Sequence, residues 1–125
     1  MTQVKICGIR TPDHGLAALE AGAGMLGFIF YRPSRRYVQP SLAAEIIAAC
    51  RARHGGWQAV GVFVDEDIDT VNAIAGECGL DLIQLAGAET SEYAASLTRP
   101  AIKVLRPAGA SWSAHGLGQA QAGYA

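Results

Sequence analysis

A cysteine stands at the end of the first predicted strand, in the run Val4-Lys5-Ile6-Cys7-Gly8. In parallel α/β proteins, ligands bind and reactions take place at the carboxyl ends of strands. A thiol ionises near a pH of about 8.5 in model peptides, and a nearby positive charge favours the ionised form. Cys7 is therefore a candidate base or nucleophile, and the alternative is a cysteine that packs as a small apolar side chain.

Positive charge gathers in the loop predicted over residues 31–39, which holds Arg32, Arg35 and Arg36. This loop follows the second predicted strand, so it lies at the same end of the sheet as Cys7. An arginine guanidinium is planar and binds a carboxylate through two parallel hydrogen bonds. The loop is therefore a candidate ligand-binding feature.

The composition limits the class of protein. The chain has 125 residues, of which 50% are hydrophobic and 17% charged, as expected for one globular domain. The net charge of −1 offers no basic surface to nucleic acid or to a membrane. The three cysteines are Cys7, Cys50 and Cys78, and no two have Cys-x-x-Cys spacing, so neither a metal site nor a disulfide framework is indicated. With no signal segment or apolar span, we expect a cytoplasmic protein.

Strand and helix patterns alternate along the chain. Apolar runs predict strands at 3–7, 25–30, 59–64, 80–85 and 101–105, and helical spacing predicts helices beginning at Pro12, at Pro40 or Ser41, at Val71 and at Glu89. Thr11 and a turn over residues 65–69 provide helix caps, and Gly22 and Gly79 provide stops. This order predicts a parallel sheet with right-handed crossovers. Residues 106–125 are rich in glycine and alanine, and we expect them to form an irregular tail.

Two architectures contain such a sheet. A flavodoxin-like receiver domain has this length, and Asp65 and Lys103 stand where its phosphoacceptor and lysine would be. However, a receiver needs an acidic pair after the first strand to bind Mg²⁺, and that position holds Arg10. The other architecture is part of a (β/α) barrel, because a complete eight-unit barrel needs about 200 residues or more.

A series of runs in the expected order resembles the phosphoribosylanthranilate isomerase family of tryptophan biosynthesis. The resemblance covers residues 3–105 and rests on Lys5-Ile6-Cys7-Gly8, Gly27-Phe28-Ile29-Phe30, Ser34-Arg35-Arg36-Tyr37-Val38, Val60-Gly61-Val62-Phe63-Val64, Leu80-Asp81-Leu82-Ile83-Gln84-Leu85, Gly87-Ala88-Glu89 and Ile102-Lys103. It implies an eight-stranded (β/α) barrel, of which residues 1–105 supply the first four βα units and the fifth strand, a half-barrel.

The resemblance also implies a function. The family converts N-(5-phosphoribosyl)anthranilate to 1-(2-carboxyphenylamino)-1-deoxyribulose 5-phosphate, an Amadori rearrangement that needs no cofactor and no metal. By resemblance, Cys7 is the general base, which takes the proton from C2 of the sugar, and Arg36 binds the anthranilate carboxylate. Arg32 and Arg35 then become solvated loop charges. Gln84 is expected to line the pocket, and Lys103 to stand at a strand end facing it.

One departure from the family limits this expectation. The family's general acid is an aspartate from the second half of the barrel, and this sequence has no Asp or Glu after Glu92. We therefore expect a truncated form with little or no turnover by itself. The alternative is a non-catalytic barrel fragment or interaction module that needs a separate C-terminal half. In either case, exposed barrel edges at the first and fifth strands would favour self-association.

Overall fold

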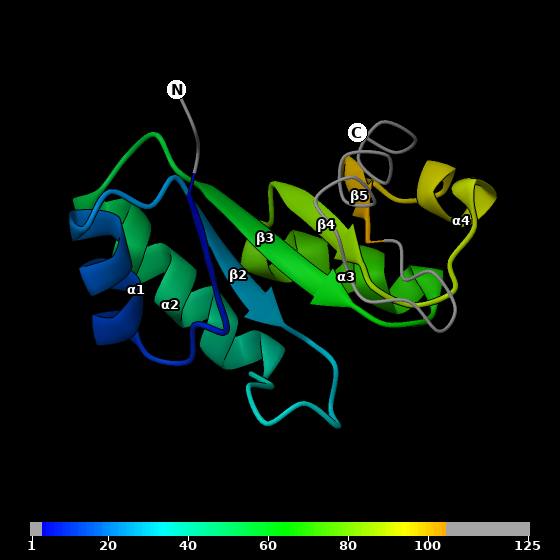
Figure 1. The fold of residues 1–125 in the computed structure, drawn as a ribbon, viewed down its shortest axis with the longest axis horizontal. Helices are drawn as coiled ribbons and strands as arrows, with labels where there is room; N and C mark the ends of the chain where they lie inside the picture. Colours follow the sequence, from blue (N-terminus) through cyan, green and yellow to red (C-terminus); the bar gives the residue numbers. More distant parts are fainter. Residues whose placement is uncertain (1–3, 105–125) are drawn as a thin grey trace, which may run out of the picture.

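A computed structural model describes residues 4–104, in which five strands alternate with four helices (Figure 1). The strands are β1 (Lys5–Cys7), β2 (Met25–Ile29), β3 (Gln58–Phe63), β4 (Leu82–Leu85) and β5 (Ala101–Lys103). The helices are α1 (Pro12–Glu20), α2 (Pro40–Arg53), α3 (Ile68–Cys78) and α4 (Ser91–Ala95). The predicted alternation of strands and helices is confirmed.

All strands are parallel, and their order in the sheet is β1-β2-β3-β4-β5. A flavodoxin-like sheet has the order 2-1-3-4-5, so the observed order excludes the receiver architecture. Each strand instead lies beside the one that precedes it, which is the arrangement of a (β/α) barrel. The sheet therefore matches the predicted half-barrel.

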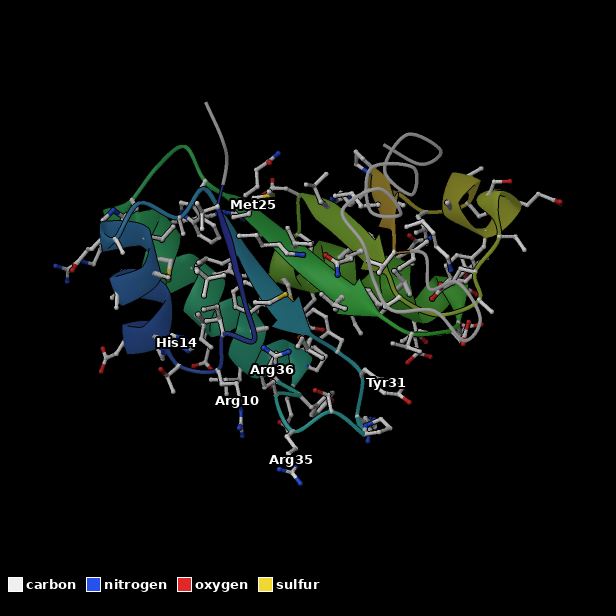
Figure 2. All side chains as sticks on the ribbon, viewed as in Figure 1. Arg10, His14, Met25, Tyr31, Arg35 and Arg36 are labelled. Atoms are coloured by element: carbon white, nitrogen blue, oxygen red, sulfur yellow. The ribbon has the colours of Figure 1, made fainter. Side chains whose placement is uncertain are left out.

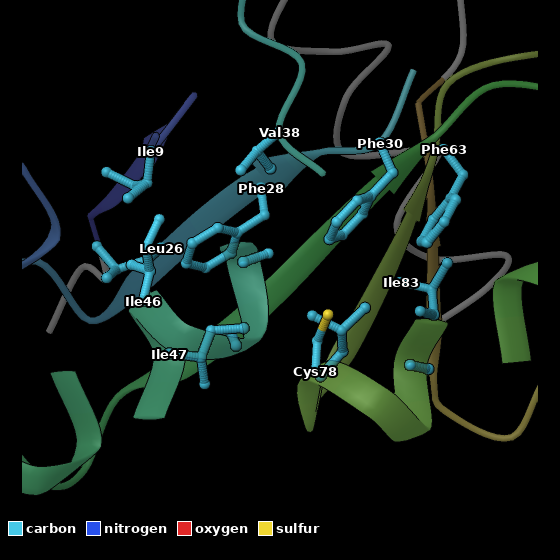
Figure 3. Packing of buried hydrophobic residues seen from close by; sticks show 14 of the residues in the cluster. Ile9, Leu26, Phe28, Phe30, Val38, Ile46, Ile47, Phe63, Cys78 and Ile83 are labelled. Carbon is cyan, nitrogen blue, oxygen red and sulfur yellow. The ribbon is translucent and has the colours of Figure 1, made fainter. Parts of the chain in front are cut away.

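The two faces of the sheet differ in what they contact. Alternate residues such as Leu26, Phe28 and Phe63 point to the helices and form the main hydrophobic core, where the Phe30 and Phe63 rings stack with their centroids 5.2 Å apart (Figure 3). On the other face of the sheet, the parallel register places residues of neighbouring strands side by side in rows. One row runs Cys7, Gly27, Val60 and Leu82, and the next runs Ile29, Val62 and Gln84. We call this second surface the inner face.

Local signals in the sequence explain where the helices begin and end. The side chain of Thr11 accepts a hydrogen bond from the His14 N–H at 3.1 Å, and Pro12 follows it at the first helical position of α1. Asp67 caps α3 by accepting from the Thr70 N–H at 3.2 Å. Gly79 ends α3 in the left-handed conformation, with φ at 70°.

Some boundaries differ from the prediction. The predicted helix at 89–97 shortens to α4, because Thr90 is its N-cap and the Glu89 carboxylate binds backbone N–H groups of the preceding loops. β4 begins at Leu82, not at residue 80, and β5 ends at Lys103. The predicted irregular tail at 106–125 lies outside the described residues and stays a prediction. Within residues 4–104, no helix combines the length and the apolar character needed to span a bilayer.

Candidate active site

Cys7 ends β1 at a sharp turn. The N–H groups of Gly8 and Ile9 both donate to the Gly27 carbonyl oxygen, at 3.0 and 3.1 Å. Gly8 has a φ of +84°, a conformation that glycine adopts readily and other residues rarely do. The turn leaves Cys7 half-buried on the inner face, at the carboxyl end of the sheet.

The Cys7 thiol lies over Gly27, its partner in the neighbouring strand. A Cβ atom placed on Gly27 would overlap with Cys7 Sγ, so any larger residue at position 27 would displace the sulfur. The glycine in the Gly27-Phe28-Ile29-Phe30 run therefore provides the space that the thiol occupies.

The arginine loop is tied to the end of β2. Tyr37 forms an isolated parallel bridge with Ile29, and the Val38 N–H donates to the Ile29 carbonyl oxygen at 3.0 Å. The Val38 side chain is buried, and the Ser34 hydroxyl oxygen accepts from the Arg36 N–H at 3.1 Å. These contacts fix the backbone on both sides of Arg36.

Arg36 lies across the turn that follows Cys7. A Cβ atom on Gly8 would lie 2.7 Å from Arg36 Cδ, so the arginine side chain packs directly on this glycine. Figure 2 shows Arg36 against the end of β1, whereas Arg10 and Arg35 point away from the sheet. Arg32 is exposed, with its guanidinium carbon 6.0 Å from the centroid of the Tyr37 ring. Of the three arginines in the loop, Arg36 is the one beside the cysteine.

A pocket of about 240 Å³ joins the two predicted site residues. It opens at the carboxyl ends of the strands, and its lining residues are Cys7, Ile29, Tyr31, Ser34, Arg36, Val62, Val64, Gln84, Ala86 and Val104. Gln84 lines it as expected, and among residues 4–104 no carboxylate does. A thiol and a guanidinium thus face one mainly apolar space, which suits proton transfer on a substrate that carries a carboxylate.

Lys103 does not face this pocket, contrary to the expectation from sequence. Its register partner Leu85 belongs to the helix-side core, so Lys103 points to the helix side as well. There its Nζ lies 2.6 Å from Glu89 Oε1, and it also donates to the Gly87 carbonyl oxygen. Glu89 accepts from the N–H groups of Asp65 and Gly87 at 2.8 and 2.9 Å. The buried pair therefore joins β5 to the loops that follow β3 and β4.

Lys5 is an inner-face residue that was not predicted to belong to the site. Its Nζ donates to Gln84 Oε1, which connects β1 to β4 across the inner face. The signal for this contact was present in the strand alternation, because residues two apart in a strand share a face and Lys5 precedes Cys7 by two. Nothing in the sequence indicated that the partner would be Gln84, because the two residues are 79 positions apart.

The remaining cysteines have the predicted packing role. Cys50 in α2 and Cys78 in α3 are both buried in the helix-side core. Burial raises the pKa of the Cys50 thiol, and burial together with the charge of Glu77 raises that of Cys78 to about 11. Within residues 4–104, no three side chains of His, Cys, Asp or Glu come close enough together to bind a metal ion.

Residues 4–121 match the family model described as "N-(5'phosphoribosyl)anthranilate (PRA) isomerase". An isomerase of that name from Geobacter sp. (strain M21) is 48% identical over 109 residues, which cover 87% of this chain and 52% of the relative. Another, from Roseiflexus sp. (strain RS-1), is 50% identical over 101 residues, which cover 78% of this chain and 47% of the relative. The chain thus spans about half the length of the curated relatives it matches.

Solved structures agree with this match. The phosphoribosyl anthranilate isomerase of Thermotoga maritima superposes with a TM-score of 0.78 at 34% identity, over 82% of this chain and 50% of that one. A second structure of the isomerase, in complex with reduced 1-(o-carboxyphenylamino)-1-deoxyribulose 5-phosphate, gives a TM-score of 0.77 at 34% identity, over 82% of this chain and 53% of that one. Since the family model covers most of the sequence and the sheet has the same strand order as a (β/α) barrel, the chain belongs to the N-(5'-phosphoribosyl)anthranilate isomerase family.

Proposed function

We propose that this chain forms the Cys7–Arg36 side of an active site that isomerises N-(5-phosphoribosyl)anthranilate to 1-(2-carboxyphenylamino)-1-deoxyribulose 5-phosphate. The observation that carries the proposal is that both side chains line one pocket at the carboxyl ends of the strands. The family assignment supplies the reaction, and a substrate with a carboxylate and an acidic C–H bond suits the two groups.

Cys7 acts as the general base in this proposal. The thiolate takes the proton from C2 of the open-chain, protonated Schiff base. The C–H electron pair becomes the C1–C2 double bond of an enolamine, and the electron pair of the C1=N bond moves onto the nitrogen. Proton return to C1 and loss of the hydroxyl proton at C2 then give the ketose. Thiols as a class suit this role, because an effective general base ionises near the working pH and thiolates form close to neutrality.

Arg36 holds the anthranilate ring in place. Its backbone is fixed by Ser34 and by the bridge between Tyr37 and Ile29, and its side chain packs on Gly8. A bidentate contact with the substrate carboxylate would orient the ribose end of the substrate toward the thiol. The small and apolar side chains of Ala86, Val62 and Val104 leave space for an aromatic ring.

The test is turnover of the phosphoribosylanthranilate substrate, followed by its fluorescence. We expect little or no turnover by this chain alone, because a general acid would come from the second half of the barrel. Mixing the chain with the separately produced C-terminal half of the Geobacter relative is expected to give measurable turnover. Failure of every such mixture, with both halves folded, would contradict the proposal.

We also propose that the isolated chain associates with itself in the cytoplasm through its barrel edges. Within residues 4–104, β1 pairs only with β2 and β5 only with β4. An apolar groove of about 300 Å³ runs beside β1, lined by Ile6 and alanines of α1 among others, and Val4 at its rim is 50% exposed. Unpaired parallel edges of this kind readily bind another strand.

Light scattering checks the association. We expect an oligomer at micromolar concentration, and we expect Val4→Lys to shift it toward the monomer because a charged edge opposes pairing. Leu42→Lys is the matched control, since Leu42 is 39% exposed and belongs to α2, not to an edge strand. A compact monomer that unfolds cooperatively would contradict this proposal.

A further inference from the structure

Lys5 lies on the inner face, and neither the family resemblance nor the proposed mechanism assigns it a role. It lies two residues before Cys7 in β1, so both side chains point to this face, with Cα atoms about 6.6 Å apart. β2 and β3 separate β1 from β4, which in a flat sheet places them three spacings of about 4.8 Å apart. The Lys5 ammonium reaches Gln84 because the sheet curves toward this face, as a barrel wall does.

The charge of Lys5 is not neutralised by a carboxylate in the part of the chain that the structure describes. The ion pairs there are Arg51 with Asp81, at 2.8 Å, and Lys103 with Glu89. The partner of Lys5 is instead the neutral amide of Gln84. Solvent screens the field of a half-buried ammonium only in part, and a neutral partner does not cancel it. Among the described residues, no carboxylate lines the adjacent pocket to offset this charge.

The bond also determines what Gln84 presents to the pocket. An ammonium group only donates hydrogen bonds, so the amide must turn its oxygen to Lys5. The two N–H donors of the Gln84 amide then remain for the pocket, which Gln84 lines together with Cys7 and Arg36. Lys5, Gln84 and Arg36 therefore all favour negatively charged or oxygen-bearing ligands.

We propose that Lys5 is a specificity-determining residue of the Cys7 pocket, which it supplies with a second positive charge besides Arg36, so that the pocket selects anionic substrates beside the thiol. This inference deepens the proposed function and relies on it for the identity of the substrate. The ligand class is a carboxylated or phosphorylated small molecule. Lys5 acts through the field at the sulfur and through the orientation of Gln84.

Alkylation of Cys7 tests the inference without any turnover. Iodoacetate is an anion and iodoacetamide is neutral, and both react with the thiolate, so the ratio of their rates reports the local field and not the degree of ionisation. We expect Lys5→Met to lower this ratio about threefold at low ionic strength. Peptide mass spectrometry separates Cys7 from Cys50 and Cys78, which are buried.

Arg53→Met is the matched control, because it removes one positive charge from the exposed end of α2, and its ratio is expected to equal that of the unchanged chain. Lys5→Arg is expected to keep the ratio, and Lys5→Gln to lower it as Lys5→Met does. The inference would be overturned if Lys5→Met and Lys5→Gln both left the rate ratio unchanged while Arg36→Met lowered it.

If the Lys5 variants fail to fold, the rate ratio in Arg36→Met still tests the inference. In Arg36→Met the lysine remains, so the ratio should stay above that of the urea-unfolded chain. A fall to the unfolded value would mean that Lys5 adds nothing, and the inference would be wrong. Because alkylation needs no partner half and no substrate, this result can stand or fail separately from the isomerase proposal.

Discussion

Replacing Cys7 with alanine is expected to reduce isomerase turnover by about 10²–10⁴-fold, the usual contribution of a well-placed general base. The measurement is made on the chain combined with a C-terminal half. Substrate affinity should change little, because the predicted carboxylate contact belongs to Arg36 and the thiol contacts only the reacting carbon. The loss should therefore fall on kcat.

Cys50→Ala is the control for this prediction. Cys50 is buried in α2 on the helix side of the sheet, so its removal leaves a cavity and lowers stability without touching the pocket. Turnover per folded molecule should be unchanged in this variant. Cys7→Ser should be nearly as slow as Cys7→Ala, because a hydroxyl is a far weaker acid than a thiol. Normal turnover in either Cys7 variant would exclude Cys7 as the base.

Breaking the buried Lys103–Glu89 pair is expected to cause the largest loss of stability, about 3–5 kcal/mol for Lys103→Met. The two side chains are only 6% and 1% exposed, so the variant leaves a carboxylate inside the protein without its counter-charge. Urea unfolding measures the change. The double variant Lys103→Met with Glu89→Leu should recover part of the loss, because it removes both charges together but leaves the N–H groups of Asp65 and Gly87 without their acceptor.

An exposed pair provides the comparison. Arg51 and Asp81 are each 39% exposed, so Arg51→Gln should cost about 1 kcal/mol or less. An equal cost for the two variants would mean that burial does not set the strength of the Lys103–Glu89 pair.

The same pair makes stability depend on pH at the acid end. Burial by itself raises the pKa of Glu89, but the hydrogen bond and charge of Lys103, together with backbone N–H donors, outweigh burial and lower the pKa below its ordinary value. A carboxyl group whose pKa is lower in the folded state than in the unfolded state stabilises the protein at pH values above its ordinary pKa of about 4.3. That contribution should disappear as the pH falls below this value, and Lys103→Met with Glu89→Leu should flatten the dependence.

Much of the fold could be predicted because its signals are local. Apolar runs mark strands buried on both faces, and Thr11, Pro12 and Gly79 mark the ends of helices. The pocket could be predicted because Cys7 ends the first strand and Arg36 lies in the loop after the second. The carboxyl ends of parallel strands lie together at one end of the sheet. The strand order, which excluded the receiver architecture, needed the structure.

Contacts between distant residues could not be predicted in the same way. Lys103 was expected to face the pocket, but a shift of one residue in a strand moves a side chain to the opposite face, and the sequence does not determine that register. Glu89 resembled an ordinary helix residue. Only the fold shows that its carboxylate accepts hydrogen bonds from backbone N–H groups of two loops. The Lys5 contact with Gln84 likewise depends on the curvature of the whole sheet.

The strand order of this sheet also shapes how the chain can fold. Paired strands follow one another in sequence, with partners separated by as few as 18 residues, for Ile83 with Ala101, and at most 33, for Met25 with Gln58. Each pairing therefore closes a short loop and costs little chain entropy, so contact order is low for a parallel sheet. The sheet can grow one βα unit at a time from the N-terminus, as the chain emerges during synthesis. The Lys5–Gln84 contact forms only when β4 has joined, so the pocket beside Cys7 is completed late in folding.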